Sequence, residues 1–72
     1  MKAITEKQVS DLRGITEHIV QASLVFRKLI GEADFLNDYE EVSDIKRRLQ
    51  KLCVDFIIMR DAVLDDYPQF RD

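Results

Sequence analysis

The feature that most restricts the fold is a pair of apolar repeats whose members follow one another in alternating steps of three and four residues. The first repeat comprises Leu12, Ile15, Ile19, Ala22, Phe26 and Leu29. The second comprises Val42, Ile45, Leu49, Leu52, Phe56, Met59 and Val63. Each repeat places an apolar stripe along one α-helix, and a seven-residue period is typical of helices that pack side by side. The sequence therefore predicts an all-α fold.

The first helix carries a start signal and a stop signal. Thr5 and Gln8 have the spacing of a capping box, in which each side chain accepts a hydrogen bond from the other residue's backbone amide. Gly31 follows the last apolar positions and suits the left-handed conformation that ends many helices. We therefore expect this helix to begin after Thr5 and to end before Gly31.

The second helix is expected to begin at Asn37 or Asp38, since either side chain can cap a helix. Pro68 disfavours helical backbone at the preceding residue and marks its end. Two helices of similar length with a short link favour an antiparallel hairpin. The single domain, 1–72, is thus expected to contain a helix over about 6–30, a connection over 31–37, a helix over about 38–66 and a tail over 67–72.

The hairpin also predicts which residues of the two helices face one another. If both stripes point inward, each residue of the first helix has a defined neighbour on the second. The expected neighbours are Phe26 with Val42, Ile19 with Leu49, and Leu12 with Phe56.

A chain of 72 residues buries too little surface for comfortable stability, so proteins of this size often use disulfides, metals or oligomerisation. Cys53 is the only cysteine, which excludes an internal disulfide and fits a reducing compartment. The N-terminal residues lack an apolar signal segment, and no apolar stretch is long enough to cross a bilayer. We therefore expect a cytoplasmic oligomer with no membrane association.

Both helices carry apolar residues beyond those that a hairpin needs. The residues expected at a partner interface are Val20, Leu24, Cys53, Val54, Ile57, Ile58 and Leu64. A contiguous second apolar face indicates an interaction site, here most simply a homodimer that forms a four-helix bundle. In the alternative, the connection or the tail covers this face through Phe35, Leu36 or Phe70.

One basic cluster raises the question of nucleic-acid binding. It comprises Lys46, Arg47, Arg48 and Lys51. Asp44 and Asp55 lie at helical contact spacing from members of the cluster, which favours ion pairs on a solvated helix. The net charge of −3 also argues against broad electrostatic binding to nucleic acid. A small dimeric nucleic-acid-binding regulator is therefore the second hypothesis.

The sequence contains no pattern that carries catalytic or metal chemistry. His18 is the only histidine, and no glutamate or second histidine stands at metal-ligand spacing from it. A phosphate-binding glycine loop and a nucleophile motif are also absent. We therefore expect a non-enzymatic protein–protein interaction module, a small regulator, adaptor or inhibitor that needs no cofactor and binds a protein partner.

Overall fold

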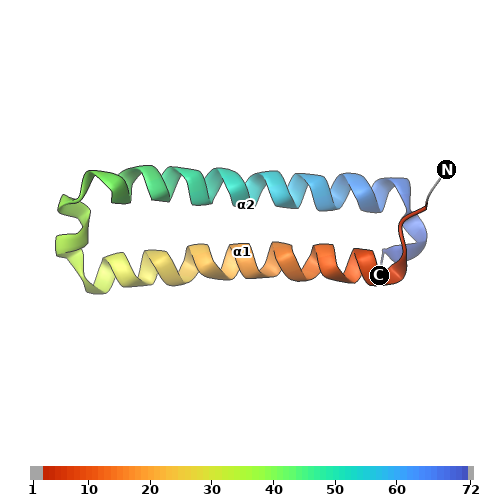
Figure 1. The fold of residues 1–72 in the computed structure, drawn as a ribbon, viewed down its shortest axis with the longest axis horizontal. Coiled ribbons are helices and arrows are strands. Elements are labelled where there is room, and N and C mark those ends of the chain that lie inside the picture. Colours follow the sequence, from red (N-terminus) through yellow and green to blue (C-terminus); the bar gives the residue numbers. More distant parts are fainter. Residues whose placement is uncertain (1–2, 72) are drawn as a thin grey trace.

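Two long antiparallel helices form the molecule in a computed structural model that describes residues 3–71. Helix α1 runs over Glu6–Glu32 and helix α2 over Glu40–Asp66. A short 3-10 helix, η1 (Asp34–Asp38), joins them, and a second one, η2 (Pro68–Phe70), follows α2. Figure 1 shows the two helices side by side along the length of a rod that measures 50 × 17 × 16 Å. The expected all-α helical hairpin is confirmed.

Helix α1 begins as its sequence predicts. The Gln8 amide donates to the Thr5 hydroxyl at 3.1 Å, and the Thr5 amide donates to the Gln8 side chain at 2.9 Å. Its end differs from the prediction, because Gly31 is not left-handed and the helix continues to Glu32. The Ala33 amide still donates to the Leu29 carbonyl at 2.8 Å. Ordinary helical bonding therefore carries the chain past the glycine.

Helix α2 begins without the expected cap. Tyr39 is the residue before the first turn, and its side chain makes no capping hydrogen bond. Asn37 and Asp38 instead belong to η1, where the side-chain amide of Asn37 donates to the Asp34 carbonyl at 3.1 Å. The prediction of a cap at either residue was wrong because both residues belong to η1, where the Asn37 side chain bonds to Asp34, and α2 begins only after Tyr39. The end of α2 at Asp66, before Pro68, agrees with the prediction.

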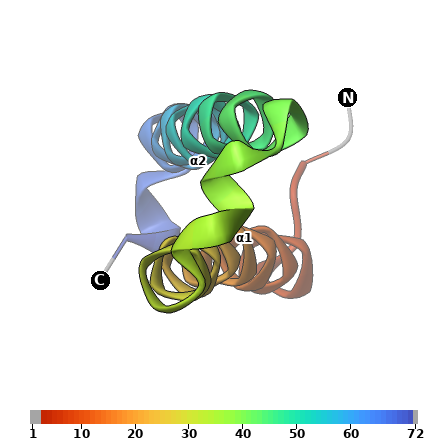
Figure 2. The same cartoon turned by 90° about the vertical axis from the view of Figure 1, so that its left-hand side faces the viewer.

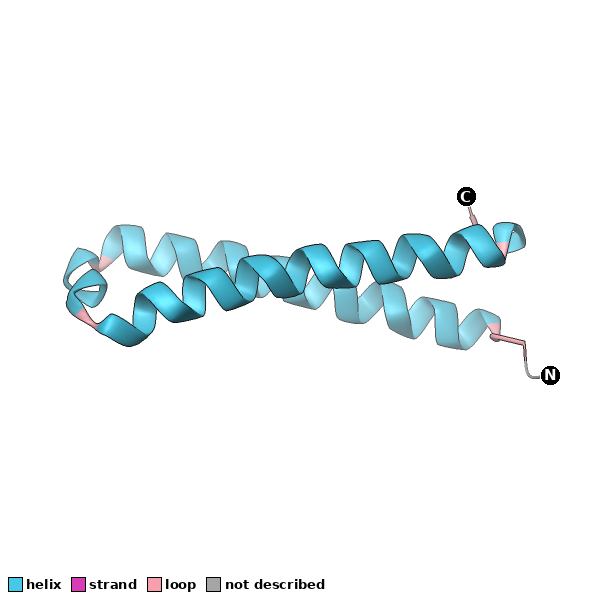
Figure 3. Ribbon diagram, turned by 90° about the horizontal axis from the view of Figure 1, so that it is seen from above, coloured by secondary structure: helices cyan, strands magenta, loops and turns pink. Residues whose placement is uncertain are grey.

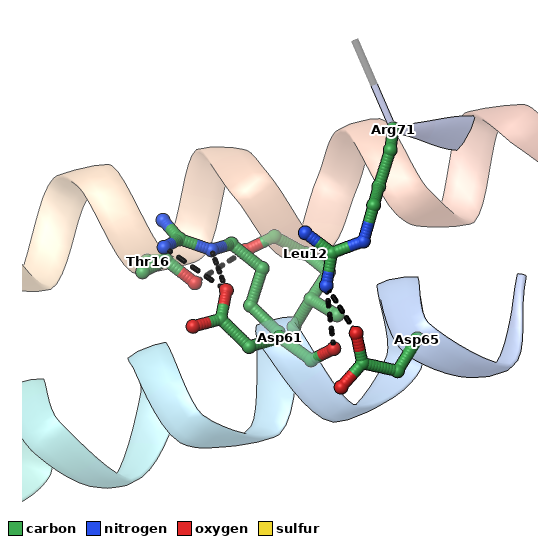
Figure 4. Close-up of polar contacts among 6 residues, drawn as sticks. Leu12, Thr16, Asp61, Asp65 and Arg71 are labelled. Carbon is green, nitrogen blue, oxygen red and sulfur yellow. Dashed lines mark hydrogen bonds and ion pairs between the residues drawn. The ribbon is translucent and has the colours of Figure 1, made fainter. Parts of the chain in front are cut away.

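Few side chains are fully buried between the helices. The buried apolar residues in the described part of the chain are Val9, Ile30, Val42 and Leu64. Thr16, at 1% exposure, is more buried than any of them. Its hydroxyl donates to the Leu12 carbonyl at 2.8 Å, which satisfies the polar group inside the contact (Figure 4). The helix contact is therefore thin and partly polar.

The pairing register differs from the prediction by about one helical turn. The Cys53 thiol lies 3.7 Å from the Ile19 carbonyl oxygen, whereas Leu49 was expected beside Ile19. Phe26 correspondingly lines a groove with Lys46, one turn after Val42. The longer α1 and the five-residue η1 move the turn toward the C-terminus, and every pair moves with it. Figure 3 shows the two helices crossing at a shallow angle.

The C-terminal tail crosses from the end of α2 towards α1 on one side of the hairpin, as the end-on view shows (Figure 2). The Arg13 guanidinium of α1 donates to the Phe70 carbonyl at 2.7 Å. Arg71 pairs with Asp65 and reaches the Asp61 carbonyl at 3.4 Å (Figure 4). Polar contacts thus hold the tail against the ends of both helices.

Candidate interaction surface

The structure divides the seven residues expected at a partner interface into two groups. Four lie in or beside the contact between α1 and α2: Val20, Cys53, Ile57 and Leu64. Of these, Leu64 is buried, and the other three are half-buried. Three are exposed: Leu24, Val54 and Ile58. The hairpin itself therefore covers much of the first group, and only the exposed residues remain fully accessible to another chain.

A larger exposed apolar surface runs along both helices and consists of residues that were expected inside the hairpin. We call it the aliphatic stripe. Its members are Ile15, Ala22 and Leu29 of α1 and Ile45, Leu52 and Met59 of α2. All six are exposed, although each belongs to one of the two heptad repeats. Their expected place between α1 and α2 was wrong, because the contact turns each helix so that a neighbouring column of residues faces inward.

The α1 and α2 halves of the stripe lie on the same side of the hairpin. Ile15 directly precedes the buried Thr16, and Leu52 directly precedes Cys53, which touches α1. One residue corresponds to a rotation of about 100° around a helix, so both residues are turned from the contact by the same offset. The approximate two-fold axis of an antiparallel pair is perpendicular to the plane of the helices. Rotation about this axis exchanges the two helices but keeps each side of the hairpin on the same side. Equal offsets on the two helices therefore point to the same side.

Half-buried apolar residues fill the space between the two rows of the stripe. They are Leu12, Ile19, Phe26, Leu49, Phe56 and Val63. This side of the hairpin is therefore apolar across its width as well as along its length. Neither link covers it: Phe35 of η1 is 65% exposed, and Phe70 of η2 lies beside Val9 and Arg13. Phe35 and Phe70 therefore leave the stripe exposed.

The opposite side of the hairpin is polar near both of its ends. Near η1, a groove of about 440 Å³ is lined by Arg27, Lys46 and Gln50 together with apolar residues of the helix contact. Near the termini, Arg13 and the tail occupy the corresponding place. The exposed Leu24 and Val54 lie between these two polar regions. This side is therefore apolar in its middle, where Leu24 is 53% and Val54 is 49% exposed, and polar towards its ends.

Three of the four basic cluster residues already have polar partners. Arg47 pairs with Asp44. The Lys51 ammonium lies 3.2 Å from the Asp55 carboxylate, and the Lys46 ammonium donates to the Asn37 side chain at 2.9 Å. Within residues 3–71, the Arg48 side chain has no hydrogen bond or ion pair. The cluster therefore consists mainly of the local pairs that its spacing predicted.

The single histidine is the residue to examine for metal or acid–base chemistry. His18 is exposed, and its Nδ1 lies 2.8 Å from the Gly14 carbonyl oxygen. No group of three potential metal ligands occurs among the described residues. Over the same part of the chain, neither helix combines the length and the apolar character needed to cross a membrane.

Comparisons of this chain with protein family models, with curated proteins and with solved structures gave no match. The aliphatic stripe is therefore the feature of the molecule that bears most directly on function.

Proposed function

We propose that the protein is a non-enzymatic interaction module that works as a homodimer, in which two hairpins bury their aliphatic stripes against each other and form a four-helix bundle. The observation that carries this proposal is the stripe: six exposed aliphatic residues on one side of a hairpin that buries few residues of its own. Contiguous apolar surface of this kind marks interaction sites on soluble proteins.

The size of this side suits a stable interface. One whole side of the rod measures 50 by 17 Å, or about 850 Å², and the rows of the stripe occupy about 21 Å of that length. The half-buried residues and the edges of this side must therefore join the contact to reach the ~800 Å² that each partner buries in a standard specific interface. The half-buried residues between the two rows would then form the centre of the bundle. Covering them supplies the hydrophobic burial that the isolated hairpin lacks.

A regulator, adaptor or inhibitor also needs a surface that binds a protein partner, and we propose the surface outside the stripe for it. Leu24, Val54 and Ile58 stay exposed when the stripe is covered, and they are the residues we propose for that partner. Nucleic-acid binding through Lys46, Arg47, Arg48 and Lys51 is the second hypothesis, and the local ion pairs of the cluster give it no added support.

Paired aspartate substitutions test the proposed dimer. The variant Ile15→Asp/Ile45→Asp changes one stripe residue on each helix. Its matched control, Leu24→Asp/Val54→Asp, changes one equally exposed apolar residue on each helix outside the stripe. We expect light scattering to give a dimeric mass for the wild type and for the control and a monomeric mass for the stripe variant, because a charge buried in the proposed interface is strongly unfavourable.

Circular dichroism of each variant shows whether it remains helical. If the control dissociates and the stripe variant stays dimeric, the interface lies on the other side and the proposal fails. If the wild type itself is monomeric at all concentrations, the proposed homodimer is excluded.

A further inference from the structure

We propose, building on the homodimer suggested above, that the second copy lies antiparallel across the stripe, with a two-fold axis that passes beside Ala22 and Leu52. In this arrangement α1 packs against α1 of the second copy and α2 packs against its α2. The two η1 connections then lie at opposite ends of the bundle. The partner that the stripe recognises is thus this same chain in one defined orientation.

The stripe has the symmetry that such an axis requires. Its rows are each spaced by seven residues, with Ala22 at the middle of one and Leu52 at the middle of the other. The contact between Ile19 and Cys53 shows that the two middles lie at nearly the same level, since Ala22 is three residues from the first and Leu52 is one from the second. A two-fold rotation there brings Ile15 opposite Leu29 of the second copy.

The charges beside the stripe favour this orientation. Arg48 and Asp55 flank the α2 row on its outer edge, four residues before and three residues after Leu52. Antiparallel packing of α2 on its copy therefore brings Arg48 opposite Asp55 of the second copy, twice in each dimer. Arg48 has no side-chain partner within residues 3–71, and Asp55 has Lys51 on its other side. The outer edge of α2 thus carries charges that are complementary to those of the same edge on the second copy.

The other face-to-face two-fold arrangement is less complementary. With both connections at the same end, α1 packs against α2 of the second copy. Arg48 then meets the apolar Val25, Asp55 meets His18, and Glu32 meets Glu41, on both edges of the bundle. The antiparallel arrangement has its own acidic contact, which joins Asp11 and Glu32 of the two copies.

That acidic contact is neutralised within each chain. Asp11 lies 3.0 Å from the Lys7 ammonium, and Glu32 lies 3.9 Å from that of Lys28. In the other arrangement Glu32 keeps Lys28, but Glu41 has no ion-pair partner within residues 3–71. The balance of charge therefore favours the antiparallel dimer.

Cysteine crosslinking of the full-length chain distinguishes the two orientations. In a Cys53→Ala background, we expect Ala22→Cys to give a disulfide-linked dimer on mild oxidation, because residue 22 lies beside its own copy at the axis. Leu29→Cys alone should give little crosslinked product. A mixture of Leu29→Cys with Ile15→Cys, refolded together, should crosslink efficiently.

The same gel identifies the outcomes that overturn this inference. Crosslinking of Ala22→Cys only when it is mixed with Leu52→Cys indicates the other two-fold orientation, and the homodimer would still stand. Absence of every crosslink from a sample that sediments as a dimer places the interface elsewhere. A sample that sediments as a monomer overturns the homodimer itself and this orientation with it.

A charge exchange supplies a second readout that does not depend on disulfide geometry. Arg48→Asp and Asp55→Arg should each raise the dissociation constant of the dimer by about 3- to 30-fold, as expected for loss of two exposed ion pairs. The double variant Arg48→Asp/Asp55→Arg should recover most of that loss. A double variant that is weaker than either single variant would contradict the antiparallel contact.

Discussion

The two long sides of the hairpin differ in how far contacts within the single chain satisfy their side chains. On the side of the tail, Arg13 holds the Phe70 carbonyl, and Arg71 pairs with Asp65. On the side of the aliphatic stripe, six apolar residues are exposed, and no described segment folds over them. Both sides consist of residues of the same two helices, so the difference comes from the chain segments that lie beside each side.

This difference indicates what kind of contact each side is built for. Polar contacts near the tail close locally, because arginine side chains and backbone carbonyls that lie close together satisfy one another. Apolar residues gain free energy only when another apolar surface removes them from water. A hairpin of two helices has no further apolar surface that could cover the stripe. We therefore propose that a second chain covers the stripe, whereas the polar contacts of the tail close within one chain.

The largest expected effect comes from truncating one leucine on each side. Leu52 in the stripe and Leu24 outside it are 41% and 53% exposed in the single hairpin. If the hairpin were the complete structure, Leu52→Ala and Leu24→Ala would have similarly small effects. Burial of the stripe instead predicts that Leu52→Ala lowers stability by about 2–5 kcal/mol per chain, and that Leu24→Ala changes it by less than about 1 kcal/mol.

Thermal unfolding of the two variants at equal chain concentration measures this difference in stability. At about 4–8 °C for each kcal/mol in a domain of this size, the two melting temperatures should differ clearly. Equal melting temperatures for Leu52→Ala and Leu24→Ala would remove the distinction between the two sides.

A smaller effect is expected from Leu64→Ala, which tests the contact that the single chain makes for itself. Leu64 is 6% exposed between the helices, so its truncation should destabilise the chain by about 2–3 kcal/mol, near the low end of the range for buried leucines. Urea unfolding gives the free energy, with the exposed Ile58→Ala as the control, expected within about 0.5 kcal/mol of the wild type. A neutral Leu64→Ala variant would show that α1 and α2 do not pack as described.

The smallest effect is expected on the tail side. Arg13→Met keeps the apolar stem of the side chain but removes the hydrogen bond to the Phe70 carbonyl, which should lower stability by about 1 kcal/mol. The change should be local, with faster hydrogen exchange at the amides of Phe70 and Arg71. Arg27→Met, which changes an exposed arginine of the same helix, serves as the control. Unchanged exchange at both amides in Arg13→Met would contradict the role of Arg13 in holding the tail.

The sequence predicted the hairpin well because its signals are local. The Thr5 capping box, the proline after α2 and the two heptad repeats all act within one or two helical turns. The predicted stop at Gly31 failed because a glycine can also continue a helix when the next amide finds its carbonyl. A cap at Asn37 or Asp38 failed because both residues belong to η1, which moves the start of α2 beyond them.

The location of the exposed surface was harder to predict because both helices are apolar over a wide arc. Several columns of residues can then face the other helix, and periodicity alone does not choose among them. Thr16 illustrates the difficulty: its hydroxyl is satisfied by the Leu12 carbonyl, so a polar residue occupies the most buried position. No sequence signal distinguished it from an exposed threonine. As a result, residues such as Leu52 were expected inside and are found outside.

The central claim is that the aliphatic stripe is covered by a second copy of the chain. Sedimentation equilibrium of the unmodified protein across the micromolar range tests it most directly. We predict a molar mass of about 17 kDa, twice the 8.5 kDa of one chain, because a hairpin of this size needs a partner to complete its core. A mass of 8.5 kDa over the whole range, in a sample that circular dichroism shows to be helical, would contradict the claim.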